Sequence, residues 1–427
     1  MRVLIIGSGG REHAMAWQCA QSGARVWVAP GNAGTHLELN VCNVDIAASD
    51  YDALIEFAQN NDIDLTLIGP EQPLVDGIVD RFQAQGLACF GPNAAAAQLE
   101  GSKAFSKSFL QRHKIPTASH QTFSDIAAAT AHIRQRGAPC VIKADGLAAG
   151  KGVVVAQSVD EALQAAQAML VDARFGDASR QIVVEDFLPG EEASFIAITD
   201  GQHILPLATS QDHKARDDGD LGPNTGGMGA YSPAPVMSDA VTQHVMRDVI
   251  QPTLAGLAAD GINYCGFLYA GLMIDAEGKA RVLEFNCRLG DPETQPIMRR
   301  LITPLQTLCT AALDGTLAQL EVEWTHQAAL GVVLASEGYP ITARNGDVIS
   351  GIAAAERLSG VKVFHAGTRG TDGEIVTAGG RVLCVSALGD TITDAKVNAY
   401  EAAAAIHFDG MFCRTDIGYR AIDRERG

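Results

Sequence analysis

The sequence predicts a mixed fold in which a parallel α/β domain is followed by an α+β middle domain and a small β-rich C-terminal domain. From Arg2 to about residue 90, apolar strand-like runs alternate with helical stretches, as in parallel sheets covered by helices. Between about residues 103 and 320, glycine turns separate paired strand-like runs, which is typical of antiparallel sheets. Beyond about residue 325 a third group of strands precedes a helix at 393–407.

Length and composition limit the number of domains and the kinds of partner that the protein can have. The 427 residues, 47% hydrophobic and 19% charged, are enough for roughly three domains, which we place at 1–102, 103–322 and 323–427. The net charge of −18 disfavours nucleic-acid partners. The nine cysteines are scattered singly, which favours the cytoplasm. We expect neither a signal peptide nor a membrane span, because the apolar runs are too short.

The N-terminal domain should carry strands at 3–6, 26–29, 65–68 and 88–90, each ending in a Gly or Pro turn. Open α/β sheets bind ligands at these carboxyl ends. The first turn, residues 7–10, opens a helix near Arg11, and its backbone N–H groups could hold a phosphate. A tight turn without a ligand is the alternative. The turns at 30–35 and 69–71 would converge on the same sheet edge, which suits a sugar phosphate.

A dinucleotide site is a weaker interpretation of the same turn. Its third fingerprint glycine would fall at position 12, which is Glu12. The second strand ends in Ala29 and Pro30, so the acid that would bind a ribose hydroxyl is missing. An NAD-dependent dehydrogenase therefore stays only as an alternative from another class.

A second glycine-rich segment lies in the middle domain. Residues 143–152, KADGLAAGKG, join strand-like runs at 141–143 and 153–155, and their glycines and lysines could close over phosphate oxygens. The segment is not a Walker loop, because Gly152 follows Lys151 where Ser or Thr would be required. The alternative is a solvated hairpin tip.

The most informative constellation lies at 282–288, on the second strand of a hairpin formed by 268–274 and 280–285. Glu284, Asn286 and Arg288 should share one face of a strand, with Leu283 and Phe285 facing the core. Carboxylate and amide oxygens are ligands that Mg²⁺ accepts. The alternative is a surface strand with an incidental ion pair.

The order of these features resembles the ATP-grasp enzymes: a lysine on a strand, a glycine-rich hairpin loop, then an acidic connector at 182–192. In that superfamily the connector lies along the adenine. The resemblance implies backbone contacts from Glu185 and Leu188, a ribose contact from Glu192, and a second phosphate lysine at Lys103. It also implies a middle domain of two α+β subdomains, of which residues from about 120 to 190 form a mobile lid.

Longer strings narrow the resemblance to the glycinamide ribonucleotide synthetase family, in its single-function bacterial form. They are GGREHA at 9–14, PGNAGT at 30–35, SQDHK at 210–214, GPNTGGMGA at 222–230 and EFNCRLGDPETQ at 284–295. Leu289 departs from the aromatic residue expected there. The resemblance implies a ligase that joins glycine to 5-phosphoribosylamine through glycyl phosphate, using ATP and Mg²⁺ or Mn²⁺ and giving glycinamide ribonucleotide, ADP and phosphate.

The resemblance also implies roles for individual residues. Lys103, Lys143, Gly146, Gly150, Lys151, Gly152, Glu185, Leu188 and Glu192 would bind ATP, and Glu284 and Asn286 the metal. Arg288, Lys214 and Asp212 would be catalytic; Gly9, Gly10, Asn32, Thr35 and Glu71 would hold phosphoribosylamine; and Asp291 and Glu293, with Asp212, would hold the glycine ammonium. His13 and His213 are expected to be structural.

Two further alternatives remain open. Another ATP-grasp ligase, one that carboxylates or formylates a purine intermediate, would differ only in its acceptor pocket. A non-catalytic nucleotide sensor would bind Mg-ATP without turnover. We expect small-molecule substrates as the only partners, and a monomer.

Overall fold

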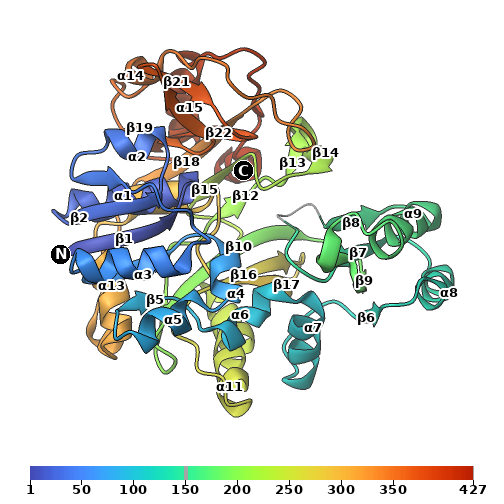
Figure 1. Ribbon diagram of the computed structural model, residues 1–427. Coiled ribbons are helices and arrows are strands. Elements are labelled where there is room, and N and C mark those ends of the chain that lie inside the picture. The colour runs from blue at the N-terminus through green and yellow to red at the C-terminus, as the bar shows by residue number, and fades with distance from the viewer. Residues whose placement is uncertain (149–151, 427) are drawn as a thin grey trace.

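The computed structural model (Figure 1) describes residues 1–148 and 152–426. The N-terminal domain is built on a five-stranded sheet in the order β3-β2-β1-β4-β5, and all its pairs are parallel. Its strands are β1 (Arg2–Gly7), β2 (Arg25–Pro30), β3 (Val41–Asn43), β4 (Leu65–Ile68) and β5 (Cys89–Phe90). The predicted parallel α/β fold is confirmed, and the short β3 is the strand that the sequence did not reveal.

Strand β1 is buried on both faces. Leu4 and Ile6 pack into one hydrophobic cluster and Val3 and Ile5 into another, because successive side chains of a strand point to opposite faces. Helices cover the sheet, and several begin at a residue whose side chain caps the first turn, such as Asn32 and Ser102. The helices around this sheet are α1 (Gly10–Gln21), α2 (Ala33–Leu37), α3 (Tyr51–Asn60), α4 (Glu71–Val75) and α5 (Ile78–Ala84). Helices α6 (Ala94–Gly101) and α7 (Lys103–Arg112) follow and pack against β17 (Ala280–Asn286) of the middle domain.

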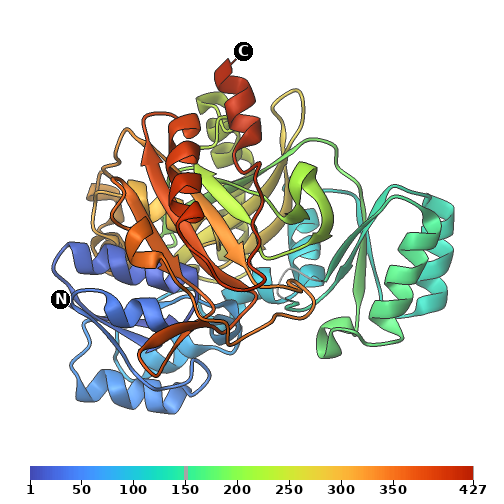
Figure 2. The same cartoon turned by 90° about the horizontal axis from the view of Figure 1, so that it is seen from above.

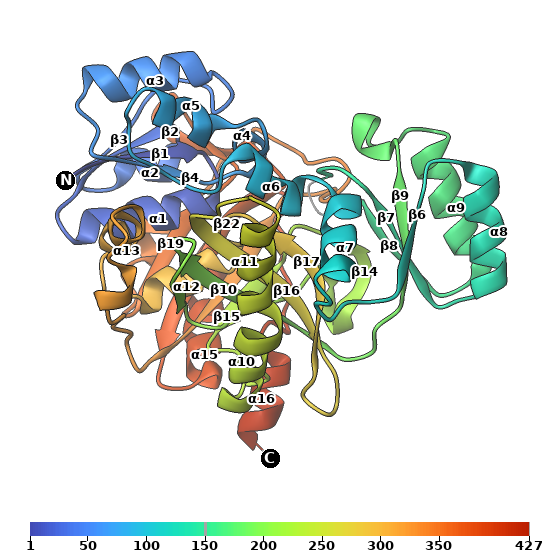
Figure 3. The same cartoon turned by 90° about the horizontal axis from the view of Figure 1, so that it is seen from below.

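A separate four-stranded antiparallel sheet, in the order β6-β9-β7-β8, occupies the region predicted to be the lid. Its strands are β6 (His120–Phe123), β7 (Cys140–Ala144), β8 (Val153–Ala156) and β9 (Ile182–Asp186). Helices α8 (Ile126–Arg136) and α9 (Val159–Leu170) pack on it and share its small core. Figures 2 and 3 show this subdomain standing apart from the body of the molecule. Its mobility stays a prediction.

The second half of the middle domain contains a four-stranded sheet in the order β11-β10-β16-β17. Its strands are β10 (Glu191–Thr199), β11 (Ile204–Pro206), β16 (Gly266–Ile274) and β17 (Ala280–Asn286), so the predicted hairpin is confirmed. The accompanying helices are α10 (Asp239–Val245), α11 (Gln251–Ala259), α12 (Thr294–Arg300) and α13 (Leu305–Leu313), with a π-helical turn at Met246–Ile250 between the first two.

The last sheet joins the middle and C-terminal regions. It runs β12-β15-β18-β22-β19, with β12 (Gln211–Asp212), β15 (Gly229–Ser232), β18 (Ala328–Ala335), β19 (Val361–His365) and β22 (Arg381–Gly389). Between β12 and β15 lies a ribbon of β13 (Ala215–Asp217) and β14 (Leu221–Asn224); β20 (Thr368–Thr371) and β21 (Glu374–Thr377) form another. The remaining helices are α14 (Ile352–Ala355), α15 (Ile392–Ala404) and α16 (Tyr419–Arg426). The sheet therefore crosses the boundary that we predicted at residue 322.

Buried histidines link the C-terminal region to the rest. His13 on α1 accepts the backbone N–H of His365 on β19 at 2.8 Å, and its other ring nitrogen lies 3.0 Å from a Glu38 carboxylate oxygen. His213 lies between Gly229 and Gly418, with hydrogen bonds of 3.2 Å to both backbones. Both side chains are buried, in keeping with the structural roles predicted for them. Among the helices within 1–148 and 152–426, none has the length and apolar character of a membrane span.

The burial of His213 predicts acid sensitivity. Burial, and then the charges of Arg414 and Arg420, lower the pKa of His213 from 6.5 to about 4, so below pH 6.5 the unfolded chain binds more protons than the folded one. The neutral, buried His213 therefore stabilises the fold fully above pH 6.5, and this contribution is lost as the pH falls towards 4. Between pH 7 and pH 5, the free energy of unfolding, measured with urea, should fall by about 2 kcal/mol more in the wild type than in His213→Gln. Equal losses would contradict the neutral, buried state of His213.

Candidate active site

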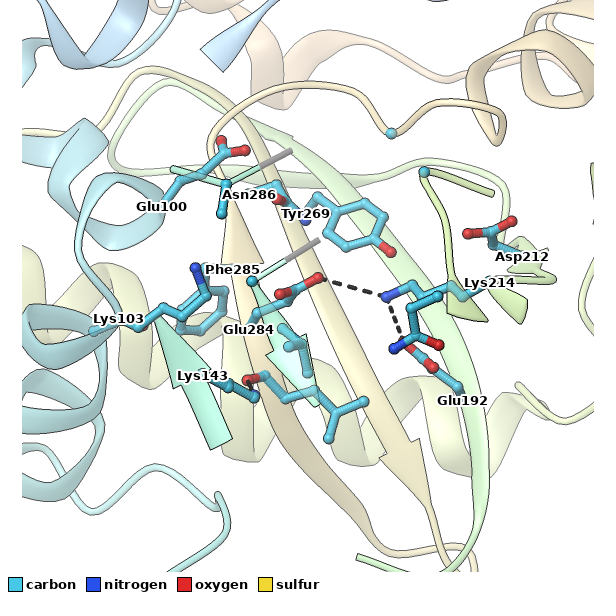
Figure 4. Close-up of a pocket in the computed structure, with 18 of the residues that line it drawn as sticks. Glu100, Lys103, Lys143, Glu192, Asp212, Lys214, Tyr269, Glu284, Phe285 and Asn286 are labelled. Atoms are coloured by element: carbon cyan, nitrogen blue, oxygen red, sulfur yellow. Dashed lines mark hydrogen bonds and ion pairs between the residues drawn. The ribbon is translucent and has the colours of Figure 1, made fainter. Parts of the chain in front are cut away.

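A cavity of about 470 Å³ lies where the lid sheet, the β10–β17 sheet and the N-terminal domain meet. Its volume is in the range of small-molecule sites. Most of the predicted site residues line it: Glu71, Lys103, Lys143, Gly152, Glu185, Leu188, Glu192, Asp212, Lys214, Glu284, Asn286, Arg288, Asp291 and Glu293. Figure 4 labels ten of the lining residues, with Glu284 among them.

Glu284 lies at the centre of the cations in the cavity. Its carboxylate is 3.5 Å from Lys214 Nζ, which also lies 2.5 Å from a Glu192 oxygen. Burial alone would raise the pKa of Glu284, but the charges of Lys214, Lys143, Lys103 and Arg288 outweigh it and lower the pKa to about 2. Glu284 is therefore ionised at any physiological pH and can offer oxygen ligands to a divalent cation.

The register of β17 differs from our prediction at Leu283. Gly271 pairs with Glu284 and Leu272 with Val282, so Leu283 is an extra residue in a β-bulge. Leu283 lines the cavity instead of facing the core, and its carbonyl accepts a 3.0 Å hydrogen bond from Lys143 Nζ. The prediction for Leu283 is wrong because one unpaired residue shifts the alternation. Phe285 is in the core as predicted, with its edge reaching the cavity.

Lys107 is a cavity residue that the sequence reasoning missed. Its Nζ lies 3.0 Å from one Glu185 oxygen, and Lys143 Nζ lies 3.1 Å from the other. Although burial opposes ionisation, the charges of Lys143 and Lys107 lower the pKa of Glu185. Lys107 follows Lys103 by four positions on α7, and this helical spacing could have identified it.

Arg288 joins β17 to the N-terminal domain. Its guanidinium lies 2.8 Å from Glu100 on α6 and 3.4 Å from Glu71 on α4, and it donates a 3.3 Å hydrogen bond to Asn286 Oδ1. The second Glu100 oxygen accepts the backbone N–H of Cys287 at 2.7 Å. Arg288 thus lines the cavity and also forms ion pairs at the end of the strand, and the sequence reasoning missed its partner Glu100.

Acidic side chains gather at the other end of the cavity. Glu293 accepts hydrogen bonds from Ser194 at 2.9 Å and Tyr269 at 3.0 Å. Burial, followed by the charge of Glu293, raises the pKa of Asp212 well above its usual value. Asp291 is held by Arg381 of the C-terminal region at 3.0 Å. A cationic ligand group would relieve the repulsion between these carboxylates.

Glu12 fills the first glycine-rich turn. Its carboxylate accepts the N–H of Gly9 at 2.5 Å and pairs with Arg11 at 2.6 Å. A Cβ on Gly69 would lie 1.9 Å from Glu12 Oε1, so the surrounding glycines leave room for this carboxylate alone. The anion position of the turn is therefore taken by the protein itself, and Gly9 and Gly10 lie outside the cavity lining, whereas Arg11 reaches it.

Asn32 and Thr35 are likewise engaged inside the protein. Asn32 Oδ1 accepts the N–H groups of Gly34 and Thr35, and its Nδ2 donates to the carbonyls of Ser8 and His365. The Thr35 hydroxyl donates to Asn43 at 2.6 Å. The structure does not bring either side chain to the cavity lining, so their predicted contact with phosphoribosylamine stays a prediction.

The glycine-rich segment 143–152, predicted to bind phosphate, lies only partly within the described residues. Gly146 accepts a 3.1 Å hydrogen bond from Lys103 Nζ through its carbonyl, while the predicted residues Gly150 and Lys151 lie outside the described ranges. Within those ranges, no cluster of three or more His, Cys, Asp or Glu side chains could enclose a metal ion. Glu284 and Asn286 fit an ion whose other ligands are phosphate oxygens and water, as Mg²⁺ prefers.

Family models, sequence relatives and a solved structure all match this chain to the same family. Models of phosphoribosylglycinamide synthetase match residues 1–100 (N domain), 101–294 (ATP-grasp domain) and 329–420 (C domain). The chain is 59% identical to phosphoribosylamine–glycine ligase of Escherichia coli K12 over 429 residues, covering 100% of both. It is 60% identical to that of Yersinia pestis over 427 residues, covering 99% of this chain and 100% of the relative. The crystal structure of phosphoribosylamine–glycine ligase from Thermotoga maritima superposes with a TM-score of 0.82 at 34% identity, over 97% of this chain and 100% of that one.

The packing around Glu12 gives a test. Gly69→Ala should destabilise the fold by about 2 kcal/mol, since the added methyl must displace the Glu12 carboxylate. Gly370→Ala is the matched control, because its Cβ would meet no atom within 4 Å. In urea unfolding, Gly69→Ala combined with Glu12→Ala should cost less than the sum of the two single changes. Strict additivity would show that Glu12 does not occupy this space.

Proposed function

Because the chain belongs to the phosphoribosylglycinamide synthetase family, we propose that its cavity joins glycine to 5-phosphoribosylamine, using ATP and giving glycinamide ribonucleotide, ADP and phosphate. It is an ATP-grasp carbon–nitrogen ligase of purine biosynthesis. The single observation that carries the site assignment is Glu284 beside Asn286 on β17, facing Lys103, Lys143 and Lys214 in one cavity.

The proposed chemistry has two steps. A carboxylate is a poor electrophile, so a glycine oxygen first bonds to the γ-phosphorus of ATP while the bond to the bridging oxygen breaks and ADP leaves. The amine of phosphoribosylamine then attacks the carbonyl carbon of glycyl phosphate, phosphate leaves, and the nitrogen loses a proton. Positioning and charge stabilisation supply most of the catalysis in such transfers.

The chain's own cations offset the phosphate charge. Lys103 and Lys143 would bind the phosphates, and Lys143 is held by the Leu283 carbonyl and Glu185. A divalent ion, Mg²⁺ or Mn²⁺, held by Glu284 and Asn286 would supply Lewis-acid stabilisation of the phosphoryl oxygens. Lys214, between Glu192 and Glu284, lies beside the ribose and phosphate positions that we propose.

The acidic end of the cavity suits the glycine ammonium. The negative charge there comes from Asp212, Asp291 and Glu293. Burial and the charge of Glu293 raise the pKa of Asp212, and a bound cation would favour its ionised form. Arg288 is the candidate that orients glycine's carboxylate or the moving phosphoryl, because its planar fork can hold two oxygens. Glu71, which pairs with Arg288, and Arg11 lie on the side of the cavity formed by the N-terminal domain, where we place phosphoribosylamine.

Several finer points belong to the same proposal. ATP would lie between the lid and β17, with its adenine along the backbone of Glu185 and Leu188 and its ribose on Glu192. We propose domain boundaries at 102 and 322, a lid that moves, a monomeric enzyme without nucleic-acid partners, and a cytoplasmic setting that fits its nine free cysteines.

The proposal predicts the effect of Glu284→Gln. The substitution keeps the shape but removes the charge that holds the divalent ion, so kcat should fall by about 100-fold or more while the far-UV circular dichroism is unchanged. The assay is phosphate release from ATP that requires both glycine and phosphoribosylamine.

Glu277→Gln, in the exposed turn of the same hairpin, is the control and should keep wild-type turnover. Release that is independent of glycine would redirect the proposal to another ATP-grasp ligase. Absence of any turnover in wild type, with Mg-ATP still bound, would favour a sensor.

A further inference from the structure

The extended segment 211–215 presents two different faces. Asp212 and Lys214 line the cavity, whereas His213 and Ala215 are buried on the opposite side, against the C-terminal region. This alternation follows from the period of two in an extended chain. Adjacent Cα atoms are about 3.8 Å apart, so the placement of His213 and Ala215 determines where Lys214 begins.

The C-terminal segment, residues 414–420, holds the buried face of 211–215. Arg414, whose side chain is fully buried, donates to the carbonyl of Ala215 at 3.1 Å. Its guanidinium also pairs with Asp220 at 2.9 Å and Asp416 at 2.7 Å. The N–H of Gly418 donates to His213 Nε2 at 3.2 Å.

Further contacts hold the ribbon that follows Lys214. Thr415 N–H donates to Asp218 at 2.8 Å, Tyr419 donates its hydroxyl proton to Asp220 at 2.7 Å, and Arg420 also pairs with Asp220. None of the residues 414–420 lines the cavity. Any effect of residues 414–420 on the cavity must therefore pass through the backbone of residues 211–220, which they contact.

The two hydrogen bonds of the His213 ring require its neutral form. Its Nδ1 lies 3.2 Å from the carbonyl of Gly229, which can only accept, and its Nε2 faces the N–H of Gly418, which can only donate. Burial and the nearby Arg414 and Arg420 lower its pKa, while Asp220 acts in the opposite direction. One ring nitrogen is thus a donor and the other an acceptor, and the ring connects β15 to the C-terminal segment.

We propose that the C-terminal segment 414–420 positions Lys214 for the reaction, with Arg414 and His213 as positioning residues. The inference rests on the proposed function in one respect, the role of Lys214 in the cavity. Lys214 Nζ lies 2.5 Å from Glu192 and 3.5 Å from Glu284, and a backbone shift of about 1 Å at residues 213–215 would break this geometry, a misplacement that can cost up to ~100-fold in rate.

A pair of substitutions at His213 separates positioning from packing. The Gln side chain can place an acceptor oxygen near the Nε2 position, whereas Asn can replace only the Nδ1 donor. His213→Gln should keep kcat within about threefold of wild type, and His213→Asn should lower it about tenfold or more, with the KM for ATP within about twofold. Equal kcat values for the two variants would overturn the inference.

A double-mutant cycle tests the route through Lys214. With Lys214 present, Arg414→Met should lower kcat about tenfold or more. In the Lys214→Ala background the same substitution should lower kcat by less than about twofold, because the side chain that Arg414 positions is absent. Val363→Ala, in the C-terminal core on β19, is the control for lost stability and should leave kcat unchanged at temperatures where each variant is folded. If Arg414→Met does not fold, the His213 pair decides alone.

The outcomes distinguish the two levels of the proposal. Full turnover in Lys214→Ala would refute the role of Lys214 and, with it, this inference. Loss of turnover in Lys214→Ala, with wild-type kcat in folded Arg414→Met and His213→Asn, would overturn only the positioning role. An equal fall of kcat in Val363→Ala would reduce the effect to general destabilisation.

Discussion

The attraction between Glu284 and the cations around it is the interaction on which the rest of the site depends. Partial burial disfavours the ionised carboxylate of Glu284, and the charges of Lys214, Lys143, Lys103 and Arg288 offset this effect. The same arrangement gathers positive charge where nucleotide phosphates would bind. Because these groups are held before any substrate arrives, little reorganisation is needed during phosphoryl transfer.

Every region of the chain contributes to holding this charge cluster. The acid comes from β17, Lys143 from the lid strand β7, and Lys103 from α7. Lys214 lies between β12 and β13, which the C-terminal region supports. Arg288 pairs with Glu100 and Glu71 of the N-terminal domain, so all three parts of the chain contribute residues to the cavity or support them.

Local patterns explain what the sequence could predict. Strand alternation identified Glu284 and Asn286, glycine-rich turns marked the edges of the sheets, and the longer strings pointed to the family. Lys107 was missed although the local spacing on α7 could have identified it, whereas the misplacement of Leu283 and the omission of Glu100 come from non-local packing. The bulge at Leu283 depends on the register of the neighbouring strand, and the bond between Glu100 and Cys287 joins positions 187 residues apart. Glu12 occupies the anion position of the first turn from the third helical position after Gly9, where an acidic side chain can reach back to the N-cap backbone.

The most direct measurement is a crystal structure with Mn²⁺ and a non-hydrolysable ATP analogue, with the metal located by anomalous scattering. The account predicts an Mn²⁺ peak about 2.2 Å from oxygens of Glu284 and Asn286, bridged to the analogue's phosphates, with Lys103 and Lys143 on the same phosphates. A metal bound elsewhere, with the Lys214–Glu284 pair intact and the phosphates distant from β17, would contradict it.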